Sequence, residues 1–345
     1  MKVAIDISPL TNNHRFRGIG SYTRCLVGAL KKNQGKNQFL LTTRAEEIRE
    51  ADLIHYPFFD PFFFTLPLFP KKKMVVTVHD LIPLVFPRHY PPGLKGRVRF
   101  LIQKKLIFQA AAIITDSGAS KKDIMKILKI SEDKIRAIHL APGREFKKLK
   151  TGIWVSELRR KYHLPEKFVL YVGDVGYNKN VLGLASACRQ LGINLVIVGK
   201  QAQSEDFNSH HPENQPLKRL IGEYGRDPRI RRLGYVPETE LVGLYNLAVC
   251  YCQPSFYEGF GLPVLEAMAC GCPVVATGVA SLPEICGKAA LLVKPGPELA
   301  SGIKLVWESS KKREELIGKG LVQSEKFSWE KTARETIEVY EKVLS

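Results

Sequence analysis

The sequence predicts an α/β fold made of two Rossmann-like, doubly wound domains. At 345 residues the chain exceeds the size at which one hydrophobic core keeps growing, so two domains of about 150 residues each are expected. Short runs rich in β-branched and apolar residues alternate with helical stretches from end to end, as in parallel sheets covered by helices. Hydrophobic residues make up 45% of the chain, which fits a globular protein.

The first series of elements predicts an N-terminal domain over residues 1–155. Its expected strands are short and apolar, because parallel strands are buried on both faces. The strands are Val3–Asp6, Phe39–Thr42, Leu53–His55, Met74–Val78, Ala112–Thr115 and Ile135–His139. The helices between them are Ser21–Lys31, Lys95–Gln109 and Lys121–Lys129.

A second series follows the polar stretch Lys147–Glu166 and predicts a C-terminal domain over residues 165–325. Its strands are Phe168–Val172, Asn194–Val198, Ile230–Leu233, Leu247–Gln253, Pro273–Ala276 and Ala290–Val293. Its helices are Val181–Gln190, Glu238–Tyr245 and Pro263–Cys270. In residues 326–345, apolar side chains recur at close to helical spacing over Trp329–Leu344. We expect this last helix to cross back to the N-terminal domain.

The charge and cysteine content restrict the class of protein. A formal charge of +18 calls for an anionic partner, such as nucleic acid, a nucleotide diphosphate or an acidic membrane surface. No nucleic-acid-reading motif is present, so we expect no nucleic acid. Seven irregularly spaced cysteines fit a reducing cytoplasm. Cys250, Cys252, Cys270 and Cys272 form two CxC pairs, which favour small buried side chains over a zinc site.

Membrane-targeting segments are not expected. Met1–Ile7 reads as a strand rather than as a signal peptide, and the apolar stretch Phe58–Phe69 is too short and too interrupted to span a bilayer. The expected location is therefore the cytoplasm.

Ligands of open α/β sheets bind beyond the carboxyl ends of the strands, so the loops there are candidate sites. The loop Arg17–Ser21 contains Gly18 and Gly20 before a helix and either binds phosphate through its amides or is an ordinary tight turn. At the end of Thr77–Asp80, His79 either contacts a ligand or forms a structural His–Asp pair.

Two further loops carry charged residues. In Val172–Asn180, Lys179 lies beside a helix N-terminus, which suits a diphosphate, although an exposed loop lysine can be merely solvated. In Glu258–Glu266, a glycine-rich turn precedes Pro263, which fits the first turn of a helix. Glu266 then falls in the first turn of that helix, and the two carboxylates can face one ligand.

The segment EGFGLPVLE, Glu258–Glu266, resembles the E-x7-E signature of the family-4 retaining glycosyltransferases, which have the GT-B fold. The order of the other loops agrees, the tail FSWE at Phe327–Glu330 is similar to the family's closing helix, and TVHDLIPLVFP at Thr77–Pro87 is most similar to a mannosyltransferase-like branch that builds surface polysaccharides. The resemblance covers essentially the whole chain and implies two domains facing across a cleft.

The resemblance also implies site residues. Glu258, His79 and Lys179 would be catalytic: Glu258 and His79 would contact the donor sugar, and Lys179 would neutralise the diphosphate. Binding residues would be Gly18, Gly20, Asp80, Asn178, Gly259, Phe260, Gly261, Leu262 and Glu266, the last on the ribose hydroxyls. Many members carry arginine where this chain has Asn178, so Arg17 or Arg144 is a candidate to supply that charge.

The implied reaction transfers a hexose, preferably mannose, with retention, from GDP-mannose or a UDP-sugar to a glycan or lipid-linked acceptor. No cofactor is implied, and no metal, because no Asp-x-Asp stands at a strand end. Domain closure would assemble the site. A nucleotide-sugar epimerase of the same fold remains an alternative. A dinucleotide oxidoreductase is disfavoured, because the Gly18–Gly20 loop lacks a third glycine.

A membrane contact is a further expectation. The helix Lys95–Gln109 mixes cations with apolar residues, and it follows the aromatic loop Phe58–Phe69 and the cluster Lys71–Lys73. Such a surface can lie on anionic lipid at the inner face of the cell membrane. The alternative is that these apolar residues pack inside the first domain.

Overall fold

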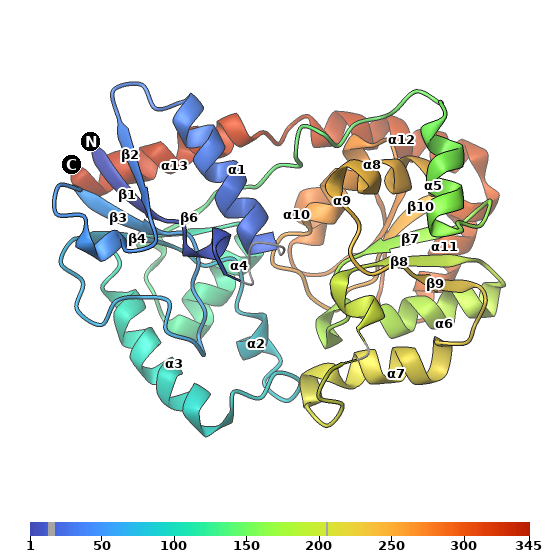
Figure 1. The fold of residues 1–345 in the computed structure, drawn as a ribbon, viewed down its shortest axis with the longest axis horizontal. Coiled ribbons are helices and arrows are strands. Elements are labelled where there is room, and N and C mark those ends of the chain that lie inside the picture. The colour runs from blue at the N-terminus through green and yellow to red at the C-terminus, as the bar shows by residue number, and fades with distance from the viewer. Residues whose placement is uncertain (13–17, 205) are drawn as a thin grey trace. The chain divides into compact units, whose positions relative to one another are not determined.

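The computed structural model describes residues 1–12, 18–204 and 206–345, which divide into two compact units (Figure 1). The N-terminal unit consists of Met1–Pro87, Pro92–Ala141 and Phe327–Ser345. The C-terminal unit consists of Arg88–Pro91 and Pro142–Lys326. Each unit is a six-stranded parallel sheet with helices on both faces, so the predicted α/β class is confirmed.

The sheet of the N-terminal unit has the strand order β2-β1-β3-β4-β5-β6. Its strands are β1 (Lys2–Asp6), β2 (Gln38–Thr42), β3 (Leu53–Tyr56), β4 (Lys73–Thr77), β5 (Ala112–Thr115) and β6 (Ile135–Ala137). The longer helices are α1 (Gly18–Lys32), α3 (Gly93–Phe108) and α13 (Trp329–Leu344). The short ones are η1 (Ser8–Leu10), η3 (Ala45–Glu47), α2 (Ile82–Val85), α4 (Gly118–Asp123), η4 (Ile124–Leu128) and η5 (Glu132–Lys134).

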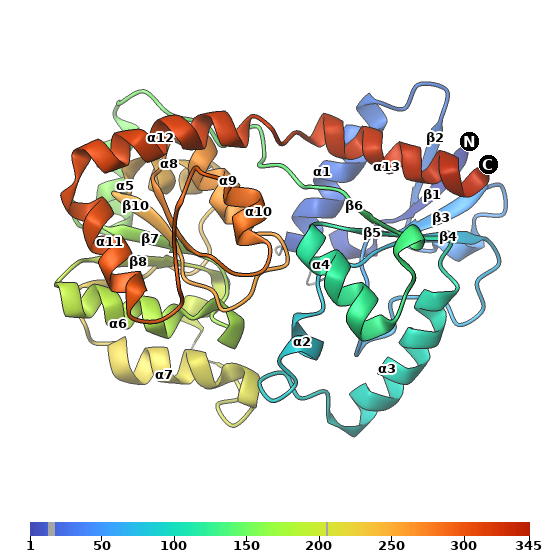
Figure 2. The same cartoon turned by 180° about the vertical axis from the view of Figure 1, so that it is seen from behind.

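The C-terminal helix α13 belongs to the N-terminal unit and packs beside α1 (Figures 1 and 2). A buried chain of hydrogen bonds anchors it: the Tyr340 hydroxyl lies 2.6 Å from His55 Nδ1, His55 Nε2 lies 2.8 Å from Thr77 Oγ1, and the Tyr22 hydroxyl lies 3.0 Å from the same Thr77 oxygen. Burial, followed by the charge of His79, lowers the pKa of His55 to about 3. His55 is therefore a neutral structural histidine, and its partner Tyr340 lies 285 positions further along the chain.

The sheet of the C-terminal unit has the order β9-β8-β7-β10-β11-β12. Its strands are β7 (Val169–Val172), β8 (Leu195–Val198), β9 (Ile230–Arg232), β10 (Cys250–Gln253), β11 (Val274–Thr277) and β12 (Leu291–Val293). The longer helices are α5 (Trp154–Tyr162), α6 (Val181–Leu191), α7 (Gln215–Tyr224), α8 (Glu238–Leu247), α9 (Leu262–Ala269), α11 (Glu298–Glu308) and α12 (Ser310–Ser324). The short ones are η6 (Tyr177–Lys179), η7 (Lys200–Gln203), η8 (Pro212–Asn214) and α10 (Leu282–Cys286).

The order in which the chain adds strands changes side between β7 and β10, which are parallel, hydrogen-bonded neighbours. The chain leaves β7 toward β8 on one side and leaves β10 toward β11 on the other, so the loops after β7 and β10 diverge at the carboxyl ends of the strands. Such a switch point is the usual ligand position in an open α/β sheet. The loops after β7 and β10 are therefore the first place to look for a ligand site in the C-terminal unit.

The division between the units differs from the predicted boundaries at residues 155 and 165. Residues 142–155 pack with the C-terminal unit, because Asn246 accepts a hydrogen bond from Leu149 N at 2.8 Å and donates one to the Lys147 carbonyl at 3.0 Å. The polar stretch Lys147–Glu166, for which no helix is predicted from the sequence, contains α5, whose single buried residue is Leu158. Its apolar residues Trp154, Val155, Leu158 and Tyr162 do recur at helical spacing, but four of its nine residues are charged, so the stretch is polar overall.

The segment Arg88–Pro91 also groups with the C-terminal unit, although the sequence placed it inside the first domain. His89 stacks on Tyr177 with ring centroids 3.3 Å apart and planes at 6°. The Tyr90 hydroxyl donates to Asn178 Oδ1 at 2.6 Å. These four residues therefore contact the loop that follows β7.

Two predicted helices of the N-terminal unit begin earlier than expected. The helix placed at Ser21–Lys31 starts at Gly18, so Gly18 and Gly20 lie in its first turn and not in a loop before it. The helix placed at Lys121–Lys129 starts at Gly118, because the Ser117 side chain caps it by accepting from Ser120 N, and it continues as a π-helical stretch over Ile124–Leu128.

Candidate active site

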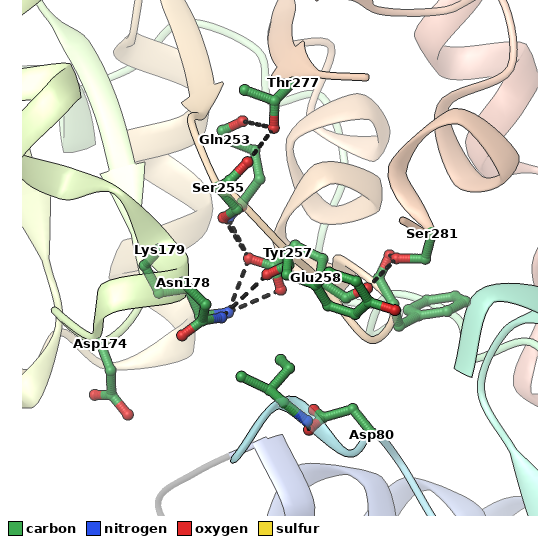
Figure 3. Close-up of polar contacts among 12 residues, drawn as sticks. Asp80, Asp174, Asn178, Lys179, Gln253, Ser255, Tyr257, Glu258, Thr277 and Ser281 are labelled. Atoms are coloured by element: carbon green, nitrogen blue, oxygen red, sulfur yellow. Dashed lines mark hydrogen bonds and ion pairs between the residues drawn. The ribbon is translucent and has the colours of Figure 1, made fainter. Parts of the chain in front are cut away.

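The switch point of the C-terminal unit brings together a lysine and a glutamate that are 79 residues apart in the sequence. Lys179, at the end of η6 after β7, places its ammonium 2.9 and 2.8 Å from the two carboxylate oxygens of Glu258, in the loop after β10 (Figure 3). The lysine side chain is about a quarter exposed, with a relative accessibility of 27%, whereas that of Glu258 is 6%. The pair therefore presents a cation at its accessible side and a carboxylate beneath it.

Glu258 is held by neutral donors as well as by the lysine. Its Oε1 accepts hydrogen bonds from Ser255 Oγ at 2.6 Å and from Gln253 Nε2 at 2.7 Å. Thr277 Oγ1 in turn donates to the Ser255 carbonyl at 2.6 Å (Figure 3). A buried carboxylate with two neutral donors and one cation is a satisfied, oriented anion, which is the arrangement a preorganised polar site requires.

The glycine-rich turn after Glu258 is fixed from the side by Ser281, whose hydroxyl donates to the carbonyls of Glu258 and Phe260 at 2.9 Å each. Gly261 caps α9 with φ +98°, and a Cβ there would lie 2.8 Å from Leu282 Cδ2. Both the backbone angle and the neighbour therefore require glycine. Leu262 begins α9 and Pro263 follows in its first turn, as predicted.

The loop after β7 is bound to the loop after β10 by two asparagines. Asn178 is buried. Its backbone carbonyl accepts from Phe256 N at 2.7 Å, and its side-chain Nδ2 donates to the Tyr257 carbonyl at 3.1 Å. Asn180, in the left-handed region at φ +50°, donates to the Pro254 carbonyl at 2.9 Å. The side-chain oxygen of Asn178 accepts from the Tyr90 hydroxyl, so both ends of the side-chain amide bind other parts of the protein. The sequence predicted a ligand contact for this residue.

Glu266 is the fifth residue of α9, one residue further into the helix than predicted. It is half-buried, and its Oε2 accepts from the Tyr245 hydroxyl at 2.9 Å. Burial, opposed by the Tyr245 hydrogen bond and reinforced by the charges of Glu238 and Glu145, raises the pKa of Glu266 to about 7. The carboxyl therefore changes charge near neutral pH.

In the N-terminal unit, His79 is bound at both ring nitrogens. Nδ1 lies 2.7 Å from Asp116 Oδ2, and Nε2 lies 3.2 Å from the Pro57 carbonyl. Burial favours the neutral ring, but the charge and hydrogen bond of Asp116, with smaller contributions from Asp80 and the Pro57 carbonyl, raise its pKa above the usual value. A ring nitrogen would have to exchange its partner before it could contact a sugar. Asp80 itself accepts from Ile82 N at 3.0 Å.

The remaining predicted residues are placed as follows. The first turn of α1 carries Gly18 and the buried Gly20, so the amides of a helix N-terminus are present there. Of the two arginine candidates, Arg144 is exposed in the segment before α5, and Arg17 lies outside the described residues.

Neither a metal cluster nor a thiolate site is found in the part of the chain that the structure describes: no group of three or more His, Cys, Asp or Glu side chains there could hold a metal ion. Cys250, Cys252, Cys270 and Cys272 are buried, and burial raises the pKa of the Cys250 and Cys270 thiols to about 12. Nor does any helix among the residues described have the length and apolar character needed to cross a bilayer.

Sequence reasoning missed several residues of the site. Gln253 and Ser255 stand five and three positions before Glu258, at the end of a strand, and this position was a usable signal. Asp116 also follows a strand directly, much as His79 does, and the same reasoning would have found it. Nothing in the sequence pairs Tyr90 with Asn178, since the two are 88 residues apart.

Two family models match the chain. The one described as Glycosyltransferase Family 4 matches residues 13–141, and the one described as Glycosyl transferases group 1 matches residues 155–321. Among curated relatives, the O-antigen chain mannosyltransferase B of Escherichia coli is 33% identical over 281 residues, covering 78% of this chain and 70% of the relative. The serotype-specific mannosyltransferase WbdA of the same species is 31% identical over 284 residues, but this chain spans only about a third of its length, with 34% covered.

Solved structures share the fold at lower identity. Anabaena Alr3699/HepE in complex with UDP-glucose has a TM-score of 0.73 at 18% identity, with 99% of each chain covered. The sucrose-phosphate synthase of Thermosynechococcus elongatus has a TM-score of 0.68 at 23% identity, covering 98% of this chain and 82% of that one. The two-domain architecture of the present chain is therefore that of the GT-B fold.

Proposed function

The chain belongs to the glycosyltransferases of family 4, and from that membership we propose that it is a retaining, metal-independent hexosyltransferase that moves mannose from a nucleotide-diphosphate sugar to a glycan acceptor. The acceptor would be a growing surface polysaccharide or a glycolipid. The observation that carries the proposal is the contact of Lys179 with Glu258 at the switch point of the C-terminal unit.

The lysine supports binding of a diphosphate. Its ammonium is the accessible half of the pair and stands at the end of η6, immediately before α6. A compact cation beside a helix N-terminus attracts a phosphate group, and the helix dipole adds to that attraction. When a diphosphate binds, Lys179 would turn part of its hydrogen bonding from Glu258 to the phosphate oxygens.

The carboxylate supports binding of the transferred sugar. Glu258 is fixed by Gln253 and Ser255, so it keeps its orientation when Lys179 moves toward a phosphate. A fixed carboxylate accepts hydrogen bonds from sugar hydroxyls. The amides of Gly259, Phe260 and Gly261, in the turn that Ser281 holds, would complete the sugar and phosphate contacts, while Leu262 borders them at the start of α9. Glu266, further along the same helix, would take the ribose hydroxyls.

The reaction then needs charge stabilisation more than proton shuttling. The bond from the sugar C1 to the diphosphate oxygen breaks, the acceptor oxygen bonds to C1 on the same face, and the acceptor proton passes to the departing diphosphate. Lys179 and the turn amides would stabilise the charge that develops on that diphosphate, and removal of one such donor typically lowers the rate by about 100-fold to 1000-fold. The chain's own cation would take the role that a divalent metal plays in other transferases.

Mannose is the preferred sugar because the O-antigen chain mannosyltransferase B, at 33% identity, is named for it. Alr3699/HepE, a structure of the same fold, was solved with UDP-glucose, which supports a nucleoside diphosphate as the carrier. We choose GDP-mannose as the first donor to test and UDP-sugars as the second. The relatives named above are transferases, so they give the epimerase alternative no support.

A thermal-shift screen tests the donor. GDP, GDP-mannose, UDP and UDP-glucose are compared, because a ligand at 100 times its Kd stabilises the folded state by about 2.7 kcal/mol. We expect GDP and GDP-mannose to raise Tm, and Lys179→Met to remove the shift. The exposed Lys294→Met is the matched control and should keep it.

Transfer is then measured with the best donor and a mannan oligosaccharide, with and without EDTA, and the anomer of the product is read by NMR. We expect transfer that is insensitive to EDTA, with the donor's configuration retained. Glu258→Ala and Lys179→Ala should lose nearly all turnover while remaining folded. Wild-type turnover in both variants, or conversion of the donor without acceptor, would contradict the proposal.

A further inference from the structure

An exposed face of the N-terminal unit combines apolar and basic side chains, and it consists of residues 62–73 and the outer side of α3. We term it the basic-apolar face. In both views α3 lies at the outside of the unit, on the opposite side of the sheet from α1 and α13 (Figures 1 and 2). We propose that this face docks on an anionic lipid bilayer. The inference goes beyond the proposed transfer reaction and does not depend on it.

The outer side of α3 is apolar where a helix in water should be polar. Leu94, Val98, Leu101 and Phe108 are exposed at helical spacing, and Leu94 retains 80% of its accessible surface. The inner side already supplies the core contacts through Leu106 and Ile107. The alternative that these apolar residues pack inside the domain therefore fails for the outer four.

The aromatic loop continues the same face. Phe63, Phe64 and Phe69 are exposed, Phe69 with 84% of its surface accessible. Gln103, buried in α3, donates through Nε2 to the Phe63 carbonyl at 2.6 Å and to Thr65 Oγ1 at 2.8 Å. The loop is thus fixed to α3 while these phenylalanines remain accessible to solvent.

The charged residues of the segment that forms the face are mostly cations. Between Asp60 and Asp116 the sequence has nine lysines and arginines and a single carboxylate, Asp80. On the face itself, the exposed cations Lys95, Arg97 and Lys105 stand among the apolar residues of α3. In bilayer-binding surfaces, apolar side chains such as phenylalanine and leucine insert at the boundary of the acyl chains, and cations lie at the level of the headgroups. The basic-apolar face has this composition.

Charge complementarity favours an anionic bilayer over a protein partner for this face. A protein interface core is depleted in lysine, whereas here lysines stand between the apolar side chains. Each cation close to an anionic bilayer is worth about fivefold in the partition coefficient, so three of them contribute roughly 100-fold.

The test is co-sedimentation of the full chain with two kinds of vesicle, one of phosphatidylcholine alone and one in which roughly a third of the lipid is the anionic phosphatidylglycerol. Binding should require the anionic lipid and weaken in high salt. The charge variant Lys95→Glu/Arg97→Glu/Lys105→Glu should lose at least about 100-fold in partition. The apolar variant Phe69→Ser/Leu94→Ser/Leu101→Ser should also lose binding, because it removes the inserted groups.

Matched controls lie on the other unit. Lys218→Glu/Lys294→Glu/Lys304→Glu makes the same change of net charge, and Ile153→Ser/Val322→Ser removes exposed apolar side chains. Both controls should bind like the wild type, and all variants should keep its Tm within a few degrees. Equal binding to both kinds of vesicle, no binding to either, or an equal loss in the controls would overturn the proposal.

Discussion

Lys179 and Glu258 contact each other through both carboxylate oxygens, at 2.9 and 2.8 Å, but they are not equally buried. The lysine reaches the surface and the glutamate does not. Removing the lysine therefore leaves a buried carboxylate, whereas removing the glutamate leaves an accessible ammonium. The two variants should differ in their free energy of unfolding.

Lys179→Met should destabilise the fold by about 2–3 kcal/mol, because it leaves a buried carboxylate without its cation. Glu258→Gln should cost about 1 kcal/mol or less, because the remaining lysine can be solvated. Urea unfolding at pH 7.5 measures both. Equal losses would show that solvent, rather than the lysine, balances the charge of Glu258.

The Tyr90–Asn178 hydrogen bond should couple the segment Arg88–Pro91 to the loop after β7. Tyr90→Phe and Asn178→Ala should each lower the free energy of unfolding by about 1–2 kcal/mol, with a coupling of about 1 kcal/mol in the double variant. Tyr162→Phe is the control, because it also removes a hydrogen-bonding tyrosine hydroxyl of the C-terminal unit, one whose partner is Glu240 and not Asn178. Strict additivity of the two changes would rule out the coupling.

The His79–Asp116 pair should make stability depend on pH. A histidine whose pKa is raised in the folded state stabilises that state below the unfolded pKa of about 6.5, and the contribution is lost as pH rises through the folded value. Asp116→Asn should therefore cost more at pH 6 than at pH 9. An NMR titration of the ring should give a pKa above 6.5 in the wild type and a lower one in the variant.

Glu266 should make the folded state less stable as pH rises, which is the opposite of the effect of an acid whose pKa is lowered by folding. Its pKa is raised to about 7, so the folded state binds more protons than the unfolded state above pH 4.5, and stability falls as pH rises to 7. After a discount for partial exposure the loss is about 1–3 kcal/mol. Glu266→Gln should flatten this fall, as measured by unfolding from pH 5 to pH 8. A ribose role would appear separately, as weaker nucleotide binding by the variant at pH 8.

Much of the fold could be predicted, because buried parallel strands leave near-continuous apolar runs, such as Met74, Val75 and Val76 in β4 and the residues of β8. Once the strands were placed, the loops at their carboxyl ends could be identified, and Lys179 and Glu258 lie in two of those loops. The contacts of Asn178 could not be predicted, since they join segments 88 and 79 residues apart. By contrast, α5 could have been predicted, because Trp154, Leu158 and Tyr162 recur at helical spacing within a stretch that is otherwise charged.

The helix α13 has a consequence for how the protein is made. The N-terminal unit takes hydrogen-bond partners from α13, Tyr340 for His55 and the Val343 carbonyl for Lys73, whereas every residue of the C-terminal unit precedes Phe327. During synthesis His55 therefore lacks its tyrosine until all of the C-terminal unit has been translated. The unit whose synthesis begins first is thus the last to receive all of its residues.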